Sequence, residues 1–521
     1  MPPAPRLSVA FANLAVGEQE AAETACSVYS TNRMQAAETG QSRGFRPDIT
    51  VRTVLAAAAP LAAGLALRVW MLKALFEVNG DSLIYGGIAR NLLLHGKYAL
   101  SLPSGEIYPT LIRLPGYPLF LALCFKLFGM ENYFSAACLQ VVMDLASCWL
   151  LAGFARRIAP GQYKRGAELA TLWLAALCPF TASYTAFPMT ETPTLFTLAL
   201  AMWAMARFRE RPGARSGWAS ALCFTFAVTC ATLLRPDGAL AAFAFAPVLL
   251  LASRKCAAGG VIPGRRLAAI AAVCASLALA PFAVWAARNW RVFHVFQPLA
   301  PRLANDPGES PNPGWERWVK SWCLDFISTY EIWWNVPWDK LDVSQLPSRA
   351  FDSPAQFDET VALANDYNEH GMEITPQIDA RFEKLAAERI ADHPLRYYVW
   401  LPLGRVADMW LRPRVENLPI DLDWWVYAHH HRETEFSWSC AGLNALYLLM
   451  GVAGLFLRPR YWIALLAYMV LRSALLLTVE APEARYTLEC FPMLFALGGV
   501  ALGRAAGGLY FSKRKASAGN G

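Results

Sequence analysis

The stretch that decides the fold is LAAIAAVCASLALAPFAVW, residues 267–285, in which no side chain is charged. A helix needs about 20 apolar residues to cross the hydrocarbon core of a bilayer, and this run is nearly that long. Similar runs recur along the chain, separated by short basic or proline-containing segments. They are Val54–Leu75, Phe134–Phe154, Gly166–Ala186, Leu195–Phe208, Ser216–Leu234, Ala239–Ala252, Trp438–Leu457, Trp462–Val479 and Phe491–Leu509. The pattern predicts an all-α polytopic membrane protein with about ten transmembrane helices.

The composition agrees with a membrane protein. Of the 521 residues, 55% are hydrophobic and 17% are charged, whereas soluble domains carry about 25% charged residues. The 12 cysteines form no CxxC pair, so the sequence supports neither a disulfide framework nor a thiolate metal site. Residues 1–50 are polar and alanine-rich and lack the features of a signal peptide. We expect them to form a disordered cytoplasmic leader.

The basic residues predict the topology. Alternate short loops are rich in Lys and Arg, as cytoplasmic loops are, and the net charge of +7 is spread along that face. This distribution argues against nucleic acid as a partner. The basic residues of these loops and of the carboxyl tail are Arg156, Arg157, Lys164, Arg165, Arg207, Arg209, Arg211, Arg215, Arg254, Lys255, Arg265, Arg266, Arg458, Arg460, Lys513, Arg514 and Lys515.

Among the opposite loops, the two short ones carry acids and single arginines in place of basic clusters. We therefore expect an amino-terminal transmembrane module at 51–290, which includes a first outer loop at 76–133. An extracytoplasmic region follows at 291–434, then carboxyl-terminal transmembrane helices at 435–510 and a basic cytoplasmic tail at 511–521. The predicted location is a bacterial inner membrane, with the functional face on the periplasmic side and the lipid bilayer as a partner.

Polar residues stand at the outer ends of the predicted helices, and each has a structural explanation. Asp81 can cap a helix at Ser82–Leu94 that stops at Gly96, and Glu191 lies in a first helical turn. Outer-face arginines can extend to lipid headgroups. Together, however, the acids and arginines of five separate loops suit an anionic substrate embedded in the membrane, because arginine is a forked, permanent phosphate donor. An aspartate can act as general base toward a hydroxyl.

The order of several motifs resembles the GT-C glycosyltransferases, and the resemblance extends over about residues 55–505. Its most specific part is D-x3-Y-x3-A-x2-L, within DSLIYGGIARNLLLHGKYAL at 81–100, followed by GYPLFLA at 116–122. PMTETPTLF, LLRP, WAARNW, ADHPLRYYVWL and PEARY follow in the expected order. The branch concerned contains protein O-mannosyltransferases, aminoarabinose transferases of lipid A and rhizobial galacturonic acid transferases.

The resemblance implies transfer of a hexose, pentose or uronic acid from a polyprenyl-phosphate donor to an extracytoplasmic glycan, lipid or protein. Asp81 matches the catalytic aspartate and Glu191 matches a recurrent outer-face acid. Arg288 and Arg485 match positions suited to the lipid phosphate, and the first outer loop is expected to hold membrane-parallel helices at Ser82–Leu94 and Tyr117–Phe128. We expect the remaining substrate-binding residues to be Tyr85, Arg113, Arg235, Asn289, Arg472, Glu483 and Tyr486.

No cofactor follows from the sequence. Many relatives have a second acid after the aspartate, but Ser82 stands here, so a required divalent metal is not supported. The run His429–His431 is also a poor zinc site, because consecutive side chains rarely point at one metal. Transfer with a lipid phosphate as leaving group needs only a base and cations, and in-line attack predicts inversion at the anomeric carbon.

The long outer region and the spans leave several alternatives open. Thr375 and Pro376 predict a helix start, with Pro394 as its stop. The tryptophans at 315, 318, 322, 333, 334, 338, 424 and 425 either anchor the chain at the interface or stack on a sugar. Within the spans, Asp144 is expected to face the bundle interior. Arg472 reaches either a prenyl phosphate or a structural partner.

Two other functions remain as alternatives. A transporter or flippase of lipid-linked sugars is expected to show inverted repeats and helix breaks near the midplane, and no internal repeat is evident. An O-antigen ligase or polymerase is expected to rely on arginines in a large outer loop, with less weight on an aspartate directly after the first span.

Overall fold

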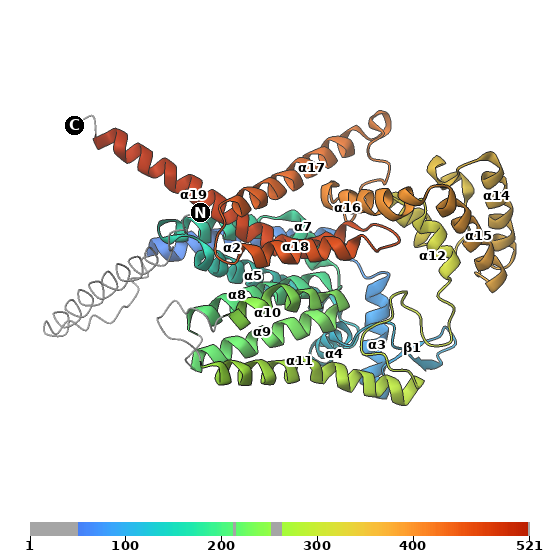
Figure 1. Ribbon diagram of the computed structural model, residues 1–521, viewed down its shortest axis with the longest axis horizontal. Coiled ribbons are helices and arrows are strands. Elements are labelled where there is room, and N and C mark those ends of the chain that lie inside the picture. The colour runs from blue at the N-terminus through green and yellow to red at the C-terminus, as the bar shows by residue number, and fades with distance from the viewer. Residues whose placement is uncertain (1–50, 212–214, 252–262, 519–521) are drawn as a thin grey trace, which may run out of the picture. The chain divides into compact units, whose positions relative to one another are not determined.

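The computed structural model describes residues 51–211, 215–251 and 263–518. The predicted leader at 1–50 lies outside the described residues. The chain divides into the units Met1–Leu55 and Ala56–Gly521, and the architecture below is that of the second unit (Figure 1).

Each apolar run predicted from the sequence falls on helix. One run, Gly166–Ala186, is broken: α6 is followed at an angle of 49° by the short α7 (Pro179–Ser183) and the turn η2 (Tyr184–Ala186). The other helices concerned are α2 (Val51–Leu75), α5 (Tyr133–Ile158), α6 (Lys164–Ala176), α8 (Glu191–Glu210), α9 (Arg215–Leu234), α10 (Leu240–Leu250), α11 (Gly264–Phe293), α17 (Tyr427–Phe456), α18 (Trp462–Leu476) and α19 (Phe491–Ala518). The all-α polytopic class is confirmed.

Within the described residues, 6 helices are long and apolar enough to cross a membrane, or 7 if the bent pair is one span. The sequence predicted about ten because it counted every apolar run. Two of those runs form helices of only 11 and 15 residues, α10 and α18. A third, α8, is 20 residues long but has Glu191 in its first turn and Arg207 and Arg209 in its last, which lowers its hydropathy.

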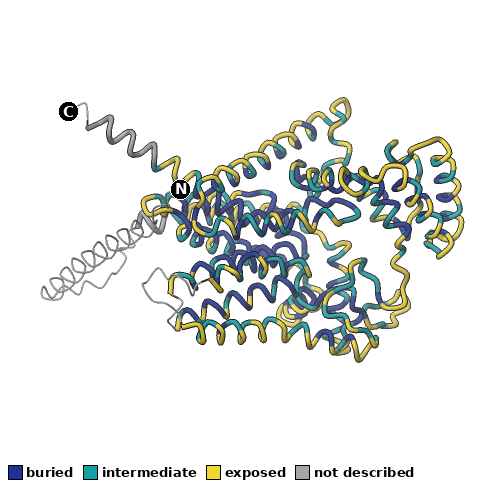
Figure 2. Tube along the Cα trace, viewed as in Figure 1, coloured by how far each residue is buried: buried dark blue, intermediate teal, exposed yellow. Residues whose placement is uncertain are grey.

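The centre of the bundle is built by α5, α6, α8 and α19, which pack closely. Small residues allow α6 and α19 to approach: a Cβ on Gly503 would lie 2.4 Å from the Ala167 backbone nitrogen. By contrast, only 6% of the most apolar part of α11 is buried, and Figure 2 shows its outer side exposed. An apolar yet exposed helix surface suits contact with lipid.

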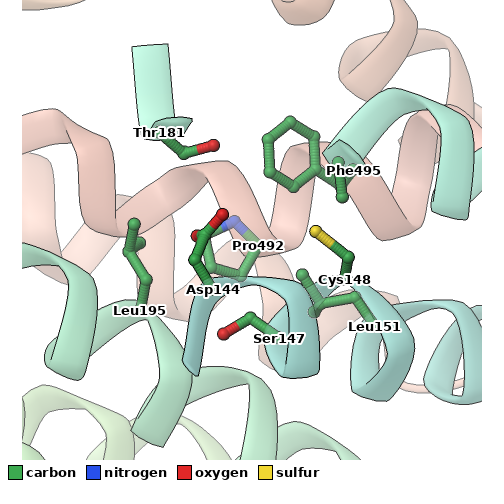
Figure 3. A pocket seen from close by; sticks show the side chains of 9 residues that line it. Asp144, Ser147, Cys148, Leu151, Thr181, Leu195, Pro492 and Phe495 are labelled. Carbon is green, nitrogen blue, oxygen red and sulfur yellow. The ribbon is translucent and has the colours of Figure 1, made fainter. Parts of the chain in front are cut away.

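Two charges buried between the spans, Arg68 and Asp144, pair with each other. The Arg68 guanidinium of α2 donates from Nε to Asp144 Oδ2 of α5 at 2.6 Å, and its other donors reach the carbonyls of Gly64, Ala175 and Ala176. Asp144 therefore faces the interior, as predicted. Figure 3 shows Asp144 beside a cavity of about 10 Å³ that also touches Ser147, which is room for about one water molecule.

The first outer loop folds as predicted into two helices. The helix α3 (Asp81–His95) ends at Gly96 in the left-handed conformation, and α4 is Gly116–Phe128. Between them lies an antiparallel hairpin of β1 (Ala99–Ser101) and β2 (Ile107–Pro109), in which Ala99 pairs with Pro109. The position of these helices relative to a membrane stays a prediction.

The long outer region folds around its own core. Its elements are α12 (Pro313–Lys320), α13 (Phe326–Ser328), η5 (Thr329–Trp333), η6 (Val343–Gln345), η7 (Ser348–Ala350), α14 (Pro354–Glu369), α15 (Pro376–Asp392), η8 (Arg396–Trp400) and α16 (Leu401–Leu411). The predicted start of α15 is confirmed, because the Thr375 hydroxyl accepts from the Ile378 amide at 3.3 Å.

Three of the outer tryptophans are neither interfacial anchors nor sugar platforms. Trp315, Trp318 and Trp322 are at most 1% exposed. They pack on one another and on Phe382 of α15. Both sequence-based interpretations were wrong for these residues, because a helical stripe of tryptophans fills a small domain core as readily as it covers a surface.

Two of the predicted cytoplasmic loops meet at one end of the bundle. The Arg460 amide donates to the Ile158 carbonyl at 3.2 Å, which joins the loop after α17 to the end of α5. Arg157 pairs with Glu210 at the end of α8 at 3.3 Å. The predicted carboxyl tail begins as helix, since α19 continues to Ala518.

Candidate active site

Asp81 lies in the first turn of α3 and is held by two arginines. One carboxylate oxygen accepts from Arg113 Nη2 at 2.7 Å, and the other accepts from Arg485 Nη1 at 3.3 Å. The expected capping role is wrong: Gly80 occupies the N-cap position, with φ of 45°, and the helix start has no side-chain cap. Both carboxylate oxygens therefore accept from arginines, and 26% of the Asp81 side chain remains exposed.

Arg485 connects Asp81 to two further acids. It lies at the start of the turn η9 (Ala484–Cys490), and pairs with Glu191 at 3.6 Å and, closely, with Glu483. The Tyr486 hydroxyl donates to Glu483 Oε1 at 2.5 Å. Both Glu191 and Glu483 are only 3% exposed. The Arg485 guanidinium is therefore paired with two buried acids as well as with the partly exposed Asp81.

A second charged cluster continues from Glu191. Arg235 pairs with Glu191 and with Glu489, each at 3.1 Å. Arg472 of α18 pairs with Glu489 at 3.1 Å and also contacts Asp237. The sequence left two alternatives for Arg472, a prenyl phosphate or a structural partner. The structure shows structural partners, because the Arg472 Nε also donates to the Tyr486 carbonyl at 2.8 Å.

Two predicted site residues lie apart from these ion pairs. Arg288 donates to the carbonyls of Thr110 and Tyr98 at 2.8 and 2.7 Å, and Asn289 donates to the Gln297 carbonyl at 2.7 Å. The two Arg288 bonds join α11 to the first outer loop. Tyr85 is closer to the centre, since the Arg113 guanidinium lies 5.8 Å from its ring centroid.

The charges around Asp81 decide its protonation. Burial opposes ionisation, but the nearby charges of Arg485 and Arg113, with their hydrogen bonds, outweigh it and lower the pKa of Asp81 to about 2. At neutral pH the carboxylate is ionised and is a weak base.

The sequence analysis missed several members of the charged clusters. Glu489 was not selected, although it bridges Arg235 and Arg472. The signal was its position six residues after Glu483, in a loop already selected. Arg68, the partner of Asp144, was hidden inside an apolar run, where a single arginine does not interrupt the pattern.

One group of side chains offers metal ligands. Among the described residues, Asp421, Asp423 and His430 place ligand atoms within 4.8 Å of one another, and both His430 nitrogens lie 3.2 Å from a carboxylate oxygen. Only one member of the His429–His431 run takes part, as expected for consecutive positions. The two aspartate side chains are 65% and 53% exposed, and the group lies outside the Asp81 ion pairs.

Residues 112–285 match the family model described as dolichyl-phosphate-mannose-protein mannosyltransferase. The resemblance to the GT-C glycosyltransferases is confirmed. The matched segment contains Arg113, Glu191 and Arg235, while Asp81 and Arg485 lie on either side of it. A comparison with curated proteins finds no match.

Solved structures of membrane glycosyltransferases are also similar to the chain. ArnT from Cupriavidus metallidurans bound to undecaprenyl phosphate has 16% sequence identity and a TM-score of 0.37, over 87% of this chain and 78% of that one. The oligosaccharyltransferase AglB from Archaeoglobus fulgidus, in complex with an inhibitory peptide and a dolichol-phosphate, has 12% identity and a TM-score of 0.45. The alignment covers 89% of this chain and 52% of AglB.

Proposed function

We propose that this GT-C protein transfers a sugar from a polyprenyl-phosphate donor to a hydroxyl group of an acceptor on the outer side of the membrane. The observation that carries the proposal is the partly exposed Asp81 carboxylate, which pairs with both Arg113 and Arg485. A partly exposed carboxylate beside two guanidinium groups provides both a proton acceptor and a phosphate site. The family match supports a lipid-phosphate donor.

The reaction needs one bond exchange. The acceptor oxygen bonds to the anomeric carbon while its proton passes to Asp81, and the bond from that carbon to the phosphate oxygen breaks. The lipid phosphate leaves with the electron pair, so the developing charge falls on its oxygens. Arg113 and Arg485 are the cations placed to stabilise that charge, and attack opposite the leaving group inverts the anomeric centre.

The same arginines make Asp81 sensitive to the donor. With a pKa of about 2, Asp81 is a poor base while both guanidinium groups point at it. A phosphate that attracts Arg113 and Arg485 removes part of that stabilisation, and the pKa of Asp81 rises toward the usual range. Donor binding therefore activates the base, which limits proton abstraction when no sugar is present.

For Glu191 we propose a positioning role in place of the catalytic one that the resemblance implies. Its side chain is 3% exposed and pairs with Arg485 and Arg235, so we assign it to positioning the two arginines. Arg288 is likewise assigned to holding the first outer loop, because its guanidinium donates to backbone carbonyls there.

The test uses envelope glycans from cells that contain or lack the chain, analysed by mass spectrometry, followed by assay of the purified protein. We expect one sugar residue to be missing from a glycan when the chain is absent, and its linkage to be inverted relative to the donor. Retention of configuration would contradict the in-line mechanism. Movement of intact lipid-linked sugar without any transfer would favour the flippase alternative.

A further inference from the structure

A second cavity lies away from the Asp81 ion pairs, in the outer region. Its volume is about 660 Å³, which is within the range of ligand-binding pockets. The lining comes from three parts of the chain: the outer region at Asp325 and Arg349, the helix α16 at Asp408, and the start of α17 at Trp438. A site assembled from separate segments around such a volume has room for a sugar-sized ligand.

The charged residues of this cavity are balanced. Asp325 pairs with Arg349, and Arg412 lies 3.7 Å from Asp408 and 2.9 Å from Glu416. Asp408 Oδ2 and the Nε and Nη1 atoms of Arg412 are nevertheless buried without a hydrogen bond. Since acids and arginines are matched, the cavity does not select an anion, but it offers donors and acceptors to a neutral polar ligand.

An aromatic wall completes the cavity. Trp424 meets Trp425 and Trp438 edge to face, with ring centroids 5.7 and 6.1 Å apart. Trp425 and Trp438 are 48% and 64% exposed, unlike the buried tryptophans of α12. Open indole faces beside paired carboxylates and guanidiniums are suited to a saccharide, whose C–H face is apolar and whose hydroxyls both donate and accept.

The surroundings of the cavity include a candidate span and charges that also act near the proposed centre. Arg412 contacts Glu416. The charge of Glu416 acts on Tyr184, as do the charges of Glu191 and Arg485 in the proposed centre. The cavity also reaches Trp438 and Ala441 of α17, a candidate span. A ligand held there can have a lipid portion alongside α17.

We propose that this cavity binds the saccharide headgroup of a glycolipid acceptor, with Trp425 as the stacking platform and Asp408 as a hydroxyl acceptor. The identification of the ligand as an acceptor rests on the proposed function, but binding of the saccharide does not depend on turnover. It narrows the acceptor from any glycan, lipid or protein to a lipid-linked sugar.

The test measures binding of simple glycosides to the full chain in phospholipid nanodiscs. The probes are the methyl and octyl glycosides of glucose, galactose, mannose and N-acetylglucosamine, used below their micelle-forming concentrations. Saturation-transfer NMR measures their binding. We expect at least one sugar to bind, with its octyl form at least about tenfold tighter than its methyl form. Trp425→Ala and Asp408→Asn should each weaken that binding about tenfold. Octyl phosphate should show no loss in either variant.

The matched control is Trp338→Ala, because this indole is 81% exposed and does not line the cavity. It should change binding less than twofold, and equal melting temperatures should show that the variants fold. Unchanged glycoside binding in Trp425→Ala, or binding of none of the probes, would overturn the site. Equal affinity for methyl and octyl forms would overturn the glycolipid assignment in favour of a soluble or protein-linked glycan.

A failure of the proposed function gives a different result. Asp81→Asn should bind the octyl glycoside as the unaltered protein does, because Asp81 does not line the cavity. If that variant also retained sugar transfer, the base assignment would fall while the binding site stood. Loss of glycoside binding in Asp81→Asn would contradict two separate sites.

Discussion

Two aspartate–arginine sites in this protein use the same groups with opposite surroundings. Arg68 and Asp144 are 0% and 4% exposed, and the arginine also donates to three backbone carbonyls. Asp81 and its arginines are 20–26% exposed, and the Nε atom of Arg113 makes no hydrogen bond. The closed pair has no capacity left for a ligand, whereas the open one does. The difference separates a structural ion pair from a candidate active site.

Loss of the two open arginines should have the largest effect. The double substitution Arg113→Gln and Arg485→Gln removes both charged donors near the proposed phosphate site. Each charge-assisted hydrogen bond contributes about 1.5–3 kcal/mol, so kcat/KM for the lipid-linked donor should fall by about 10²–10⁴-fold. Steady-state assays with the donor varied will measure this. A change of less than about threefold would show that the arginines do not bind the donor.

The closed pair should respond in stability instead. Asp144→Asn leaves the Arg68 charge buried without its counter-ion, which costs about 3–5 kcal/mol. Thermal unfolding in detergent should show a clear fall in the melting temperature. The transfer rate per folded molecule should stay within about twofold of the original, and a rate lost without a fall in stability would mean that this pair is also functional.

The pKa of Asp81 gives a prediction for pH. Its folded pKa of about 2 lies below the unfolded value of about 3.9. Ionised Asp81 therefore adds stability above about pH 4, and this contribution is lost as the pH falls through 2. In Arg485→Gln the folded pKa should rise, because the largest attractive charge is gone.

Melting temperatures and kcat/KM between pH 3 and 7 measure this shift. As the pH falls, Arg485→Gln should lose thermal stability and kcat/KM at a higher pH than the unaltered protein. Arg485→Lys, which keeps the charge, provides the control and should lie between the two. Identical acid limbs in Arg485→Gln and the unaltered protein would contradict electrostatic control of Asp81.

The smallest effect is expected far from both ion pairs. Thr375→Ala removes the N-cap hydrogen bond of α15 and should cost about 1 kcal/mol. A matched substitution, Ser353→Ala, removes the equivalent cap of α14. Chemical denaturation should detect both losses of stability, and sugar transfer should be unchanged. A loss of transfer in either variant would show that the fold of the outer region is needed for the reaction.

Local patterns in the sequence predicted the helices well. The apolar runs, the stop at Gly96 and the start at Thr375 are signals contained within a few residues. The alternation of basic and acidic loops also placed Asp81, Glu191 and Arg485 on one face, and the structure brings these three together.

Long-range pairing was beyond those patterns. Asp81 and Arg485 are 404 residues apart, and no local rule shows that they touch or that Arg288 instead holds backbone carbonyls. The tryptophans of α12 were misread because the helical stripe is the same for a domain core and an exposed surface. The cavity beside Trp425 depends on three separate segments and has no local sequence signal.

The most direct test of the account is sugar transfer by Asp81→Asn at saturating donor, with donor affinity measured in the same preparation. A general base contributes about 10²–10⁴-fold, so single-turnover transfer should fall by that factor. The donor should still bind at least as tightly, because Arg113 and Arg485 remain and no longer face a carboxylate. Undiminished transfer would contradict Asp81 as the base, and with it the proposed difference between the open and closed ion pairs.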